Sequence, residues 1–229
     1  MKRYIRFLLR SFGLCVALLL LVSCSNAYNQ AYFKAVDSAL GIHKRDLLVH
    51  RVEKARESQE EAKEQFKTAL EKFSALTNFD GGGLEAKYKQ IQSEYDDSKE
   101  KAEAIHKRIT DVEDVAQALF SEWQGELEQY SNAGMRRNSE QKLRATQRRY
   151  EKLISAMKQA ESKIQPVLEA FEDQTLYLKH NLNAKAIASL KGEFQSVEND
   201  IGALIREMEK SINEADSFIQ SMETSNSDA

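Results

Sequence analysis

Apolar residues recur along most of this chain at alternating steps of four and three, the spacing typical of α-helices that pack side by side. Four such seams follow one another, and a short break separates each seam from the next. The seams run from Leu48 to Leu76, from Leu84 to Tyr130, from Leu143 to Leu178 and from Ile187 to Met222. In the first seam only Gln59 is polar.

The breaks contain the residues that interrupt helices. Three consecutive glycines begin at Gly81, Asn132 and Gly134 mark the second break, and Asn181 and Asn183 mark the third. We therefore predict helices over about 28–77, with a hinge near 41–46, and over 84–130, 135–180 and 183–222, followed by a disordered tail at 223–229. Because the helices are similar in length and the breaks are short, residues 28–222 should form one all-α domain. Its predicted architecture is an elongated antiparallel four-helix bundle or coiled coil with up-down-up-down topology.

The single proline, Pro166, lies inside the third seam. An interior proline removes one helical hydrogen bond, yet the seam passes through it without losing register. We expect a kinked but continuous helix, and a new helix that starts near Pro166 is the alternative.

The N-terminus carries an export signal. Basic residues precede a leucine-rich stretch that is shorter than the ~20 residues needed to span a bilayer, and Leu21-Val22-Ser23-Cys24 follows as a lipobox. We expect a signal peptide over 1–23, lipidation at Cys24 and a lipid-anchored linker over 24–27. The alternatives are an uncleaved anchor or a simple secretory signal. Ser25 favours the periplasmic face of the outer membrane of a Gram-negative cell over the inner membrane.

Charge and composition narrow the function. Without the four basic residues of 1–23, the chain has 29 basic and 36 acidic residues, a net charge of about −7. An acidic exported protein is a poor nucleic-acid binder, so we expect no nucleic-acid partner. Cys15 and Cys24 are the only cysteines, and neither remains for a disulfide, a zinc site or a nucleophile.

The charges around Asn132 are uneven. Six acidic residues and no lysine or arginine lie between Thr110 and Gly134, whereas six basic residues and one acidic residue lie between Met135 and Arg149. One interpretation is that the two antiparallel helices pair across their turn. The other is that this turn returns to the membrane, so that Arg136 and Arg137 contact an anionic lipid surface.

Candidate chemistry is sparse. Glu103 and His106 have the Glu-x-x-His spacing of di-iron bundles, but such a site needs two pairs and two further carboxylates, so we interpret them as a solvated pair. The scattered His43, His50 and His180 lack metal-ligand clustering. The tyrosines follow helical spacing and are expected in or near the core. We predict no catalytic residue, no cofactor and no metal site.

Three segments carry a family resemblance: Gly41-Ile42-His43-Lys44-Arg45-Asp46, Phe79-Asp80-Gly81-Gly82, and the run from Leu176 to Ala184 that includes Lys179-His180-Asn181-Leu182-Asn183. In these the chain resembles Domain of Unknown Function 2959, a family of bacterial envelope proteins, over nearly all of the mature sequence. The resemblance implies a helical lipoprotein of unassigned activity and supplies no catalytic residues.

Two functional hypotheses remain. The first is a non-enzymatic envelope lipoprotein, a structural or partner-binding scaffold tied to the membrane by its lipid and bound to an unidentified envelope protein. The second is a small-molecule or lipid carrier, or an enzyme, with a site between helices. Heptads do not distinguish pairing within a chain from pairing between chains, so a homo-oligomer is a further alternative.

Overall fold

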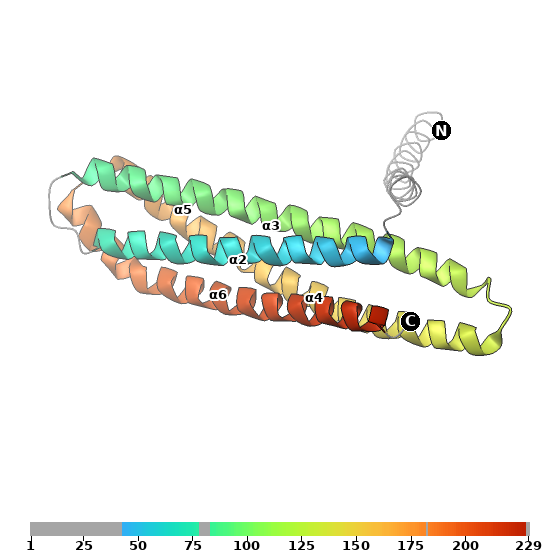
Figure 1. Cartoon of the computed structure of the whole chain (residues 1–229). Coiled ribbons are helices and arrows are strands. Elements are labelled where there is room, and N and C mark those ends of the chain that lie inside the picture. The colour runs from blue at the N-terminus through green and yellow to red at the C-terminus, as the bar shows by residue number, and fades with distance from the viewer. Residues whose placement is uncertain (1–42, 78–82, 182, 228–229) are drawn as a thin grey trace, which may run out of the picture.

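The computed structural model describes residues 43–77, 83–181 and 183–227, which form an all-α bundle (Figure 1). Its helices are α2 (Lys44–Thr77), α3 (Leu84–Leu127), α4 (Ala133–Ser162), α5 (Ile164–His180) and α6 (Ala184–Ser227). Since α4 and α5 follow each other end to end, the bundle consists of four long rods, and the predicted four-helix architecture is confirmed. None of the described helices is long and apolar enough to cross a membrane. The predicted signal peptide, the linker and the first helical residues before His43 lie outside the described residues.

The rods are arranged as a ring of antiparallel neighbours. α2 packs against α3 and α6, and the α4–α5 rod packs against the same two helices from the other side (Figure 1). Two contacts fix the end at which α2 begins: Lys44 forms an ion pair of 2.9 Å with Glu122 of α3, and the Arg45 guanidinium donates a 3.0 Å hydrogen bond to the Met222 carbonyl of α6. The second turn, between α3 and α4, therefore lies at the same end as the start of α2.

The core follows the predicted seams. All nine positions of the first seam are buried, Gln59 among them. Toward the other end, the ring of Phe73 contacts the rings of Phe171 and Phe194, with centroids 6.2 and 5.8 Å apart. Each such large apolar side chain stabilises the fold by roughly 1.5–3 kcal/mol when fully buried. The predicted pairing surfaces thus close within a single chain.

The second seam departs from prediction at its end. Glu126 and Tyr130 lie on the predicted stripe but are exposed. The reason is that α3 and α4 extend past the start of α2 and the end of α6 (Figure 1), so that among the described helices they have only each other as neighbours there. A two-helix hairpin has too few neighbours to cover the whole stripe.

The third helix is not continuous. It is interrupted at Lys163, whose N–H donates to the Ala160 carbonyl instead of the carbonyl one residue earlier. Pro166 is then the third residue of α5. First-turn residues have no intrahelical acceptor for their N–H, so a proline there removes no bond. The expectation of one continuous helix is wrong, and the alternative of a new helix near Pro166 is confirmed.

Local conformations explain the other boundaries. Gly83 precedes α3 with φ 93°, a left-handed conformation that favours glycine. The Asn132 side chain caps α4 by accepting hydrogen bonds from the N–H groups of Gly134 and Met135. At the C-terminus α6 continues to Ser227, so the expected disordered tail is helical for its first residues.

Candidate functional site

The residues predicted to contact lipid fall in two places. Cys24 lies outside the described residues, and its lipidation stays a prediction. Arg136 and Arg137 lie in the first turns of α4, where both are exposed. Neither forms an ion pair with another residue that the structure describes.

Three acidic residues of α3 have described partners outside the basic segment that follows the turn. Glu122 pairs with Lys44, and Asp111 lies 3.6 Å from Arg51, so that both reach cations of α2. Glu113 pairs with Lys158, which lies beyond the basic segment. In the described part of the chain, Glu113 is paired with α4 through Lys158, and Glu122 and Asp111 are paired with α2. Pairing of the remaining charges across the turn stays a prediction.

A groove of about 480 Å³ opens between α3 and the α4–α5 rod. It lies where the rod is interrupted at Lys163. Its apolar side chains are Ala102 from α3 and Ile164 and Leu168 from α5, and charged and polar side chains line the rest. Four of these side chains are acidic, namely Glu103, Glu161, Glu169 and Glu172. Lys99 and His106 are the two basic side chains of the lining.

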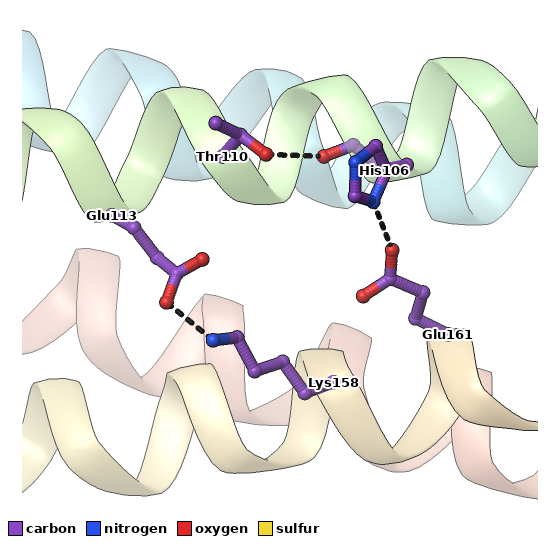
Figure 2. A network of polar contacts seen from close by, with 5 residues as sticks. All are labelled: His106, Thr110, Glu113, Lys158 and Glu161. Carbon is purple, nitrogen blue, oxygen red and sulfur yellow. Dashed lines mark hydrogen bonds and ion pairs between the residues drawn. The ribbon is translucent and has the colours of Figure 1, made fainter. Parts of the chain in front are cut away.

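A polar network crosses the groove between the helices. The His106 Nδ1 atom lies 2.6 Å from Glu161 Oε1, and the side chain of His106 is 75 % exposed. Figure 2 shows this pair beside a second one, in which the Lys158 ammonium donates to the Glu113 carboxylate. The Thr110 hydroxyl donates to the His106 carbonyl within α3. His106 thus pairs across the interface with Glu161.

The titratable phenols near this interface are held protonated. Burial, followed by the charge of Glu172 and its hydrogen bond, raises the pKa of Tyr95. Burial and the charge of Glu113 raise the pKa of Tyr150 to about 12. Both phenols stay neutral at physiological pH, so neither supplies a base or a nucleophile there. The groove offers negative charge, hydrogen bonds and an apolar floor.

The histidines and acidic residues do not gather into a metal site within the described part of the chain. No group of three or more His, Cys, Asp or Glu side chains there is arranged to hold a metal ion. Glu103 and His106, which share the di-iron spacing, both line the groove beside Glu161, Glu169 and Glu172, but the groove lining contains no second Glu-x-x-His pair.

Two features were not identified from the sequence. The first is the groove, which lies beside the interruption at Lys163, and Pro166 was the one sequence signal near its position. The other is an exposed apolar pair near the end of α5, Leu176 and Tyr177, which are 51 % and 40 % exposed. Both lie in the segment that carried the family resemblance.

Comparison with known proteins places this architecture in a family. No curated protein and no solved structure is similar enough to be matched. Residues 32–222 match the family described as "Protein of unknown function (DUF2959)". This match spans the whole described bundle up to the last turns of α6, and the chain therefore belongs to the DUF2959 family.

Proposed function

We propose that this protein is a non-enzymatic, lipid-anchored helical scaffold of the bacterial cell envelope. Its residue 24 is acylated, its rod lies on the periplasmic face of the outer membrane, and its exposed surfaces bind another envelope protein. The observation that supports this proposal is that apolar residues of all four seams pack together in one continuous core. With the interior filled by apolar side chains, the charged outer faces and the two ends are left for interaction.

Lipid attachment is tested by metabolic labelling in a Gram-negative host. Labelled palmitate should be incorporated into the wild-type chain and lost in Cys24→Ser. Cys15→Ser is the matched control, because it removes the other cysteine and lies in the predicted signal peptide. Label that persists in Cys24→Ser, or a wild-type chain without label, contradicts the anchor.

Partner binding is tested by photocrosslinking in cells. A photoreactive amino acid replaces Leu176, which is half exposed at the end of the rod away from the start of α2. Lys191, exposed on α6, serves as the control position. One envelope protein captured repeatedly at position 176 and absent at position 191 supports the scaffold. No covalent adduct at either position contradicts it.

A second candidate function is favoured by the groove. Its volume of about 480 Å³ lies within the ~300–1,000 Å³ of ligand sites, so a carrier of a small cationic molecule would use this space. Ala102→Trp would fill the groove floor. A small molecule that copurifies with the wild type and is lost from Ala102→Trp would support the carrier over the scaffold.

A further inference from the structure

The first half of α4 is a concentrated positive surface on an otherwise acidic protein. Seven basic and two acidic residues lie between Arg136 and Lys152. Within the described residues this segment has one ion pair, between Arg144 and Glu140 of the same helix. The remaining cations have no anionic partner in the described bundle, which is why their charge faces outward.

Four basic residues of this segment, the paired Arg144 among them, share one face. Arg137, Arg144, Arg148 and Lys152 are spaced by seven, four and four residues, and all are exposed. At 3.6 residues per turn these positions form one stripe, about 22 Å long at 1.5 Å per residue. We call these four residues the basic ribbon. Arg136 lies about 100° around the helix axis from Arg137 and is not part of it.

The ribbon begins at the end of the bundle where α2 starts. Lys44 contacts Glu122 at 2.9 Å, and α3 and α4 extend beyond this level (Figure 1). Lys44 follows Cys24 by 20 residues, a length of chain that spans at most ~70 Å. A lipid on Cys24 would thus hold the ribbon within reach of a bilayer surface.

Charge complementarity identifies the occupant. The ribbon presents cations, with Glu140 and Glu151 along one edge and no large apolar side chain among them, so it suits a surface of dense negative charge and not an apolar groove. We propose that the basic ribbon lies against the anionic lipid headgroups of the membrane to which the protein is anchored. This proposal rests on the lipid anchor and deepens it, because it adds a second contact that orients the rod along the membrane.

The test places a fluorescent probe on the ribbon. Ser155 is exposed and lies three residues beyond Lys152 on the same face. The single tryptophan, Trp123, is replaced in the full chain by Trp123→Phe, and Ser155→Trp moves it onto the ribbon. Ser93→Trp, at an exposed position of α3, is the control probe. Vesicles contain phosphatidylcholine with a nitroxide-labelled headgroup, with or without phosphatidylglycerol, and quenching of tryptophan emission reports headgroup contact.

We expect strong quenching at position 155 when the vesicles contain phosphatidylglycerol and weak quenching when they do not. Quenching at position 93 should be weak in both cases. Arg137→Gln/Arg148→Gln/Lys152→Gln should lower the ratio of docked to undocked protein by about 100-fold, since each basic residue near an anionic surface contributes a factor of about 5. Lys99→Gln/Lys179→Gln/Lys191→Gln removes the same charge from exposed positions elsewhere and should retain docking. Far-UV circular dichroism checks that all variants remain helical.

The outcomes separate the two proposals. Equal quenching at positions 155 and 93, or equal losses in the two triple variants, overturns the ribbon. A chain that incorporates palmitate but shows no quenching at position 155 overturns the ribbon and leaves the anchor. Quenching at position 155 in a chain that carries no acyl group supports the ribbon and overturns the anchor.

Discussion

At the residue scale, the least expected contact is a polar pair inside the core. The Ser211 hydroxyl of α6 donates a 2.8 Å hydrogen bond to the Gln59 amide oxygen of α2, and both side chains are fully buried. The Gln59 Nε2 atom is buried without a partner in the described structure. A buried unsatisfied donor is costly, so this pair contributes little net stability.

We predict that replacing one residue of the pair lowers the free energy of unfolding, whereas replacing both leaves it unchanged or raises it. Ser211→Ala leaves the Gln59 amide wholly unpaired and should lower the free energy of unfolding by about 1–3 kcal/mol. Gln59→Leu/Ser211→Ala replaces both polar groups by apolar ones and should be near neutral or stabilising. Urea denaturation followed by circular dichroism measures both, with Ser217→Ala as an exposed control on α6. A double variant less stable than Ser211→Ala would refute this account.

The sequence predicted which face of each helix is buried, but not which residues meet. Heptad spacing assigned Gln59 to the first seam, yet it contains no information on the axial level at which two helices cross. It also assumes that partners cover the whole seam. Tyr130 is exposed for that reason, because α3 and α4 extend past the start of α2 and the end of α6.

At the element scale, a single side chain orders the start of α4. Asn132 accepts hydrogen bonds of 2.8 and 3.1 Å from the first N–H groups of the helix. No acidic residue lies in that first turn, and the nearby arginines are unfavourable to the helix dipole. The cap is therefore the main local device that holds this helix end together.

We predict that Asn132→Ala destabilises the start of α4 by about 1 kcal/mol, the typical loss for a removed N-cap. Amide hydrogen exchange in the first turns of α4 should then accelerate about fivefold, while exchange in α5 stays unchanged. Asn132→Asp keeps an accepting oxygen and adds a favourable negative charge, so exchange should remain slow. Equal acceleration in both variants would show that the cap is not the cause.

The helix boundaries that the sequence predicted well are those set by local chemistry. Gly83 and Asn132 mark breaks that backbone conformation and capping require. The interruption at Lys163 was harder to predict from the sequence, because the seam keeps its register through Pro166. Whether a proline lies within a helix or in its first turn is decided by packing.

At the scale of the whole molecule, the seams and short breaks were sufficient to predict the four-rod topology. The groove between α3 and the α4–α5 rod was not predicted, because its lining combines residues far apart in the sequence whose meeting depends on helix packing. The pairing of α3 acidic residues with α2 was also missed, since sequence proximity favoured the neighbouring helix α4.

We predict that the protein is a monomeric rod in solution, because each long helix finds both of its neighbours within the same chain. Helix α3 alone has 44 residues and spans about 66 Å. Small-angle scattering should give a radius of gyration well above ~17 Å, the value for a compact globular chain of about this size. Analytical ultracentrifugation that shows a dimer at micromolar concentration would instead indicate seams that close between chains.

The hydrogen bond from Arg45 to the Met222 carbonyl determines which end of the rod a C-terminal label would mark. It places the end of α6 beside the beginning of α2, so an epitope or fluorescent protein fused after Ala229 marks the same extremity as a label near residue 43. A tag inserted between α5 and α6 marks the opposite extremity, one rod length away. Distances measured from C-terminal fusions would therefore describe only the end at which the bundle begins.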